Sequence, residues 1–177
     1  MAAPTEVNLQ DYVRAIPDFP KPGVLFRDIM PLLAAPQAFR QAIRQLADRV
    51  RDRRIDVVVA AEARGFLVAA PLALELNASL VPVRKPRKLP GKVVSHTYEL
   101  EYGSDTLEMQ VDAIRRGARV LVVDDLLATG GTVEACCRLV EKLGGQVVGC
   151  AFLIELVSFA GAKRIVAYEP VSLIKYD

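Results

Sequence analysis

Length, composition and charge limit what this chain of 177 residues can be. A hydrophobic fraction of 52% is ample for one buried core, so we expect a single domain. The 23 basic and 21 acidic residues give a formal net charge of +2, which lacks the basic excess of a general nucleic-acid-binding protein. No stretch is apolar for long enough to span a bilayer or to form a signal peptide. We therefore expect a soluble, cytoplasmic protein with no nucleic-acid or membrane partner.

Hydrophobic periodicity predicts alternating helices and strands along most of the chain. Apolar residues at helical spacing indicate amphipathic helices, and runs rich in valine indicate strands buried on both faces. In chain order these are a helix over 36–50, a strand over 55–61, a helix over 66–76, a strand over 80–84, a strand over 120–123, a helix over 132–143 and a strand over 147–156. The alternation predicts an α/β fold with an open, mostly parallel twisted sheet flanked by helices. Ligands of such sheets bind beyond the carboxyl ends of the strands.

Two segments depart from this alternation. Pro17, Pro20 and Pro22 stiffen the N-terminal segment and exclude a regular helix there. Over residues 92–112, apolar and polar residues roughly alternate around a turn at 102–105, which predicts two antiparallel strands that form a flap rather than core.

Residues 120–132 carry the most informative motif, VLVVDDLLATGGT. It predicts a buried strand, two adjacent carboxylates and a loop of small residues that opens into a helix. Backbone N–H groups and hydroxyls of such a loop, together with the helix N-terminus, can bind a phosphate. The loop residues are Ala128, Thr129, Gly130, Gly131 and Thr132.

Asp124 and Asp125 follow the strand directly, and two adjacent anions are costly unless they meet hydroxyl donors or a metal. The hydroxyls of a ribose whose 5′-phosphate lies in the loop would supply such donors. The loop has neither the lysine of a P-loop nor the glycine spacing of a dinucleotide site. A plain glycine turn between a core strand and a helix is the alternative that remains.

These thirteen residues resemble the phosphoribosyl pyrophosphate motif of the type I phosphoribosyltransferases. The resemblance implies their fold, with a small N-terminal hood over about 1–34 and a flexible antiparallel flap over about 92–112 in a single domain of residues 1–177.

Residues 16–29 resemble the hood of one group within this family, the adenine phosphoribosyltransferases. In that group the backbone at the positions of Leu25 and Arg27 reads the adenine edge, and the side chain at Phe26 packs on the ring. A carbonyl and an N–H at these places complement adenine, whereas hypoxanthine presents the wrong pattern. On residue type alone, a plain core residue is the alternative for Phe26.

Two further segments resemble the family's pyrophosphate site. Arg64, next to Gly65, would grip pyrophosphate through its forked donors, while Glu62 and Ala63 receive no side-chain role. A cluster of cations follows the strand over 80–84, where a solvated loop is the alternative. The resemblance favours three of them as ligands of pyrophosphate, namely Arg84, Lys85 and Lys88.

Glu101 and Tyr102 match the family's flexible catalytic loop. The resemblance implies that Glu101 interacts with the imidazole side of the purine and acts together with Arg64 and the two aspartates in catalysis. Glu99 is a rival for this role, and His96, the only histidine, has no partner for a metal site.

The resemblance therefore implies a pentosyl transfer from phosphoribosyl pyrophosphate to adenine, which gives AMP and pyrophosphate in purine salvage. Mg²⁺ would be held mainly by substrate oxygens and water rather than by a protein cage. A homodimer is expected from the same resemblance. Two alternatives stay open, a transferase for hypoxanthine, guanine or xanthine, and a regulator that senses phosphoribosyl pyrophosphate.

Overall fold

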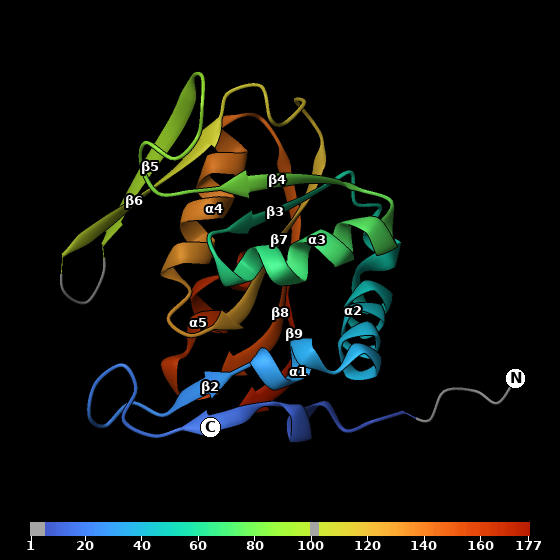
Figure 1. Cartoon of the computed structure of the whole chain (residues 1–177). Coiled ribbons are helices and arrows are strands. Elements are labelled where there is room, and N and C mark those ends of the chain that lie inside the picture. Colours follow the sequence, from blue (N-terminus) through green and yellow to red (C-terminus); the bar gives the residue numbers. More distant parts are fainter. Residues whose placement is uncertain (1–5, 100–102) are drawn as a thin grey trace, which may run out of the picture.

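The computed structural model describes residues 6–99 and 103–177, and a parallel sheet of five strands lies at its centre (Figure 1). The strand order is β4-β3-β7-β8-β9, and each neighbouring pair is parallel. The strands are β3 (Val57–Ala61), β4 (Ser79–Val83), β7 (Arg119–Leu127), β8 (Gln146–Leu156) and β9 (Pro170–Tyr176). The predicted open α/β sheet is confirmed.

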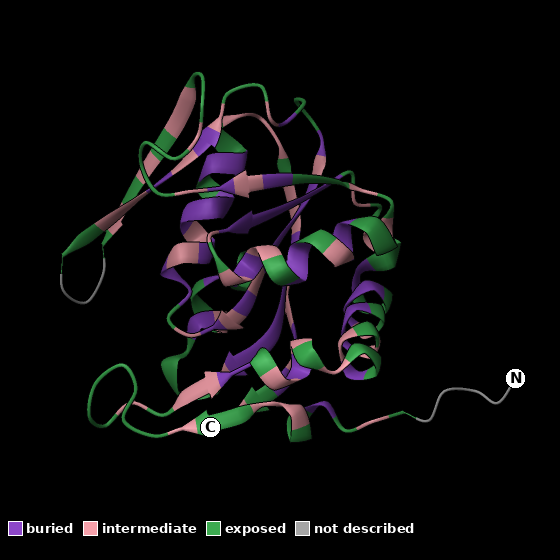
Figure 2. Cartoon of the chain, viewed as in Figure 1, coloured by how far each residue is buried: buried purple, intermediate pink, exposed green. Residues whose placement is uncertain are grey.

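Helices cover both faces of this sheet. The helices are α1 (Met30–Ala34), α2 (Pro36–Val50), α3 (Arg64–Leu76), α4 (Gly131–Lys142) and α5 (Gly161–Arg164), with short 3-10 turns at Leu9–Tyr12, Arg51–Arg53, Val157–Phe159 and Val166–Tyr168. Alternate residues of β3 face opposite sides, so Val58 packs with α2 and α3 while Val59 packs with α4. Figure 2 accordingly shows the central strands buried and the outer helix surfaces exposed.

Two antiparallel hairpins extend from this core. β1 (Arg14–Ile16) pairs with β2 (Phe26–Asp28) in the N-terminal segment, and β5 (Val93–Glu99) pairs with β6 (Ser104–Gln110) in the predicted flap. The base of the second hairpin belongs to the core, because Leu107 and Met109 of β6 are buried in the same cluster as α4.

The structure extends several predicted elements. α3 begins at Arg64, two residues before the predicted start, and continues through Pro71. The carbonyl that loses its hydrogen bond to proline is that of Leu67, a residue 44% exposed, so water can reach this side of the helix. β7 continues to Leu127 because β8 pairs with it along this stretch. No helix in the described ranges has the length and apolar character needed to cross a membrane.

Candidate functional site

The candidate site lies where the strand order of the sheet reverses. β3, the first strand of the sheet in sequence, has β4 on one side and β7 on the other. β3 pairs with β7 only as far as the register of Ala60 with Val123, whereas β7 continues to Leu127. The edge of β7 that faces β3 is therefore unpaired from Asp124 onward. Such a switch point at the carboxyl ends of parallel strands is where open α/β sheets bind ligands.

Asp124 and Asp125 occupy this unpaired part of β7. The Asp125 side chain is 5% exposed, and its Oδ2 lies 2.9 Å from Nε of Arg64, the first residue of α3. This contact is close but not aligned as a hydrogen bond, since Oδ2 is a buried oxygen without a hydrogen-bond partner among the described residues. An oxygen of this kind can accept a bond from a substrate hydroxyl or bind a metal ion.

The two carboxylates also influence each other. Burial and the adjacent charge of Asp125 raise the pKa of the Asp124 carboxyl well above its usual value. Asp124 Oδ1 accepts a hydrogen bond of 2.9 Å from the Asp125 amide. A Cβ atom at Gly65 would lie 2.9 Å from that same oxygen, so only glycine lets α3 begin beside this carboxylate.

The loop of residues 128–132 forms the predicted cradle between β7 and α4. Gly130 caps α4 with a φ of +80°, a conformation that favours glycine. The amides of Thr129, Gly130 and Gly131 donate none of the backbone hydrogen bonds that turns, loops and helix caps form in the described ranges. An α-helix leaves its first amides without intrahelical acceptors, so this N-terminus has donors for an anion.

One residue that the sequence analysis did not single out contacts the cradle from the flap. The hydroxyl of Tyr98, on β5, lies 3.2 Å from Oγ1 of Thr132. The same strand is held to α4 by Lys142, whose Nζ donates to the carbonyl of Ser95 at 2.8 Å. The hairpin is thereby attached to the phosphate loop, a contact between residues far apart in sequence.

The predicted pyrophosphate cations lie beside the loop that joins β3 to α3, and each contacts an acidic side chain. Arg84 Nε and Lys88 Nζ lie 2.7 and 2.6 Å from the two carboxylate oxygens of Glu62. Lys85 Nζ lies 3.1 Å from Asp105 Oδ2 on β6. Glu62, for which no side-chain role was predicted, therefore forms ion pairs with two of the three cations.

A cavity of about 410 Å³ separates the N-terminal hairpin from the start of α3. Its lining is mostly apolar, with one carboxylate and one guanidinium, and consists of Ile16, Phe19, Phe26, Asp28, Ile29, Met30 and Arg64. The Phe26 ring has Phe19 edge-on at 5.1 Å between centroids and the Arg64 guanidinium at 5.1 Å. The size and lining suit a flat aromatic base.

Strand alternation explains which hood residues reach this cavity. Phe26 and Asp28 share one face of β2 and line it, whereas Arg27 points the other way and lies 3.8 Å from the centre of the Tyr176 ring. Leu25 precedes β2 and is 49% exposed. Any contact of Arg27 with a base in this cavity would therefore use its backbone groups, and the role of the Leu25 backbone stays a prediction.

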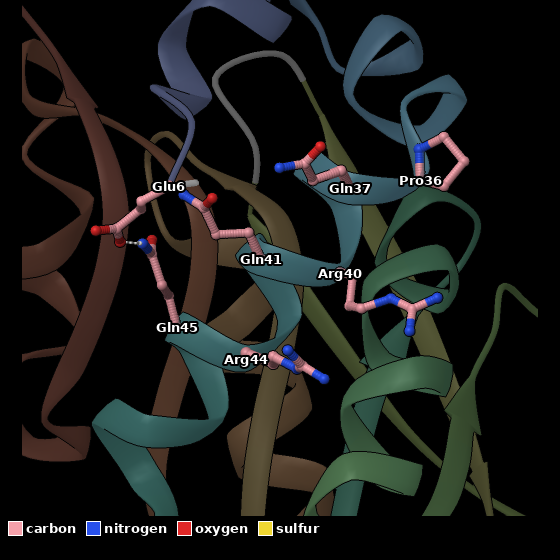
Figure 3. A pocket seen from close by; sticks show the side chains of 7 residues that line it. All are labelled: Glu6, Pro36, Gln37, Arg40, Gln41, Arg44 and Gln45. Carbon is pink, nitrogen blue, oxygen red and sulfur yellow. Dashed lines mark hydrogen bonds between the residues drawn. The ribbon is translucent and has the colours of Figure 1, made fainter. Parts of the chain in front are cut away.

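A larger cavity, of about 630 Å³, lies elsewhere on the surface of α2 (Figure 3). Glu6 accepts a hydrogen bond of 2.6 Å from Gln45 on one side of it, while Arg40 and Arg44 point to the other side. It shares no residue with the loops at the switch point. Size alone therefore does not identify the site, whose chemistry is concentrated at the strand ends.

Two predicted residues, Glu101 and Tyr102, lie outside the described residues. Within the described part of the chain, no group of three or more histidine, cysteine, aspartate or glutamate side chains could hold a metal ion by itself.

Comparison with known proteins gives a consistent family. The model of the phosphoribosyl transferase domain matches residues 31–175. The adenine phosphoribosyltransferase of Desulfitobacterium hafniense is 56% identical over 96% of this chain and 98% of its own length, and that of Rhodopirellula baltica is 56% identical over 96% and 82%.

Solved structures agree with this. The adenine phosphoribosyltransferase of Thermoanaerobacter pseudethanolicus has a TM-score of 0.93 at 50% identity, covering 95% of this chain and 98% of the other. That of Saccharomyces cerevisiae, in complex with adenine and an imino-altritol bisphosphate, has a TM-score of 0.87 at 38% identity, covering 93% and 96%. With the family model and the full-length relatives in agreement, the chain belongs to the adenine phosphoribosyltransferases of the type I phosphoribosyltransferase fold.

Proposed function

We propose that the chain transfers the 5-phosphoribosyl group of phosphoribosyl pyrophosphate to adenine, giving AMP and pyrophosphate, and that the switch point is its active site. The observation that carries this assignment is the meeting of three groups at one sheet edge. The phosphate loop and the carboxylate pair belong to β7 and its extension, and the Arg64 guanidinium reaches that pair from the start of α3.

Each part of the substrate has a matching part of the site. The 5-phosphate would bind the amides and hydroxyls of residues 128–132, and the ribose hydroxyls would donate to Asp124 and Asp125. The pyrophosphate would lie against Arg64 and the cations of the basic loop. Adenine would occupy the cavity beside Phe26, which shares Arg64 with the pyrophosphate side.

The reaction forms a bond from N9 of adenine to C1 of the ribose and breaks the bond from C1 to the pyrophosphate oxygen. The electron pair of the broken bond leaves with pyrophosphate, and the ribose becomes cationic in the transition state. Arg64, Arg84, Lys85 and Lys88 would stabilise the leaving group, and the buried Asp125 carboxylate would stabilise the sugar cation.

The flap has the remaining role in this proposal. Glu101 would orient the purine, or act as a general acid toward its imidazole ring as N9 attacks. Closure of the flap would exclude water, which otherwise hydrolyses the activated sugar. The contact of Tyr98 with Thr132 supports this, because it links the flap to the phosphate loop.

Magnesium fits this site as a substrate-bound ion. The buried Oδ2 of Asp125, which has no hydrogen bond within the described residues, and its neighbour Asp124 offer the oxygen ligands that Mg²⁺ prefers, while most of the ion's ligands would be substrate oxygens and water. When bound, the ion would neutralise negative charge on the pyrophosphate.

We further propose a cytoplasmic homodimer. Cys136, Cys137 and Cys150 are buried free thiols, as is usual in a reducing compartment. The outer face of α3 is apolar and exposed at Leu67 and Leu74, which supports an interface with a second copy.

A product assay tests the function directly. Purified protein is incubated with phosphoribosyl pyrophosphate and labelled adenine, hypoxanthine, guanine or xanthine, with and without Mg²⁺. We expect labelled AMP from adenine, a turnover at least about a hundredfold higher than with any other base, since the polar edge must match, and loss of activity on chelation. Equal or higher turnover of another purine would contradict the assignment to adenine. The absence of turnover with every base would contradict the proposed phosphoribosyltransferase activity.

A further inference from the structure

The Glu62 carboxylate is placed between two cations that the proposed function assigns to pyrophosphate. Its side chain is 9% exposed, and each oxygen contacts a different partner, Oε2 with Arg84 Nε and Oε1 with Lys88 Nζ. The two cations are more open to solvent, with side chains 37% and 48% exposed. The acid is therefore enclosed while its partners can still reach a ligand.

The backbone fixes this carboxylate in position. The Glu62 amide donates to the carbonyl of Val83 at 3.0 Å, and Val83 is the last residue of β4. Arg84 follows it and is held in turn by paired hydrogen bonds with the backbone of Glu108. Glu62 and Arg84 thus follow neighbouring parallel strands and meet at the same sheet edge.

The charge state agrees with this geometry. Burial alone would raise the pKa of the Glu62 carboxyl, but the hydrogen bonds from Lys88 and Arg84 outweigh it and hold the pKa below its usual value. Glu62 is therefore an anion at neutral pH, and it uses donors that a pyrophosphate would also need.

We propose that Glu62 is a positioning residue that occupies Arg84 and Lys88 until pyrophosphate displaces it. This inference rests on the proposed function. The carboxylate keeps the two cations directed at the site, and it also competes with the pyrophosphate group for them, because the same donors cannot align fully on two anions that repel each other. Glu62 thereby limits the affinity for pyrophosphate and favours release of the product.

The decisive variant is Glu62→Gln, which keeps the size of the side chain and removes its charge. Calorimetric titration with magnesium pyrophosphate should give a dissociation constant about tenfold lower than that of the wild type, as expected when a competing ion pair worth about 1.4 kcal/mol is lost. AMP, which uses the phosphate loop and not the basic loop, should bind both proteins equally. Glu141→Gln is the matched control, since Glu141 also has two partners, Arg138 and Tyr168, far from the switch point.

Unchanged or weaker binding of pyrophosphate by Glu62→Gln would overturn the proposal, because a residue that only supports the cations must lower the affinity when it is lost. Glu62→Asp keeps the charge and shortens the reach, so it is expected to bind with intermediate affinity, and an affinity equal to the wild type would also overturn the proposal. Glu62→Asp still tests the proposal if Glu62→Gln fails to fold. Failure of the wild type to bind both AMP and pyrophosphate would instead reject the function on which the proposal rests.

Discussion

Replacing Asp125 should affect catalysis much more than the stability of the fold. Its carboxylate is buried beside Asp124, and one of its oxygens has no hydrogen bond within the described residues. In Asp125→Asn we expect turnover to fall about a hundredfold or more, because a charge aimed at the developing sugar cation is lost. The melting temperature should change little, because relief of the repulsion from Asp124 offsets the loss of the ion pair with Arg64. Steady-state kinetics and thermal unfolding measure the two effects.

Asp48→Asn is the control for this comparison. Within the described part of the chain, the Asp48 carboxylate has an ion pair only with Arg51, at 3.4 Å, and it lies near the end of α2, away from the switch point. It should leave both turnover and melting temperature within error. Wild-type turnover in Asp125→Asn would remove Asp125 from the catalytic residues.

The sequence could predict functional residues that are contiguous, but not pairs formed by the fold. Asp124, Asp125 and the loop after them were predicted because strand, acids and small residues follow one another in a single motif. Glu62 was missed because its partners are 22 and 26 residues away and meet it only when β3 and β4 align. Tyr98 was missed for the same reason, since it lies 34 residues from Thr132.

At the scale of elements, the phosphate loop depends on its packing against α5. A Cβ atom added at Gly161 would lie 3.0 Å from the carbonyl carbon of Ala128 and from the amide nitrogen of Gly130, so the loop must move in Gly161→Ala. We expect the dissociation constant of AMP, measured by calorimetry, to rise at least about tenfold, because misplacing a preorganised site by ~1 Å costs up to about a hundredfold. The folded state should lose about 1–3 kcal/mol from overpacking.

Gly117→Ala separates this effect from a general cost of replacing glycine. An added Cβ there meets no atom within 4 Å, although the φ of +77° is unfavourable for alanine. It should cost about 1–2 kcal/mol of stability and leave AMP binding unchanged. If Gly161→Ala binds AMP as the wild type does, the loop does not depend on this contact.

Elements whose apolar residues follow one clear periodicity were predicted, whereas the short strands β1 and β2 and the strand β9, which begins with proline and carries polar residues, were not. The valine runs of β3 and β7 and the amphipathic pattern of α2 have a single interpretation. β9 was missed because it begins at Pro170 and carries Ser172 and Lys175, which is tolerable only because the strand lies at the edge of the sheet. The β1–β2 hairpin was missed because its strands have three residues each and are separated by a proline-rich loop.

At the scale of the whole molecule, one helix joins the active site to an exposed apolar face. α3 begins at Arg64, and its outward face carries Leu67, Ala70 and Leu74, whose spacing of three and four residues places them together. A groove of about 510 Å³ beside it, between α2 and α3, is lined in part by Leu33, Phe39, Ile43 and Pro71. Monomers rarely expose large apolar patches, so this surface supports the proposed dimer, and we propose that its interface lies along the helix that begins at Arg64.

Leu74→Glu tests this interface, because Leu74 is 84% exposed and a charge there costs nothing in an isolated chain. Sedimentation should show twice the chain mass for the wild type and a single chain mass for the variant, since an unpaired charge cannot be buried between two apolar faces. The control is Val166→Glu, at a residue 68% exposed on a different part of the surface, which should remain a dimer. Because α3 also positions Arg64, which lies on the pyrophosphate side and lines the adenine cavity, dissociation should raise the KM values for both substrates. A Leu74→Glu protein that remains dimeric would show that the two copies meet elsewhere, and its KM values should then equal those of the wild type.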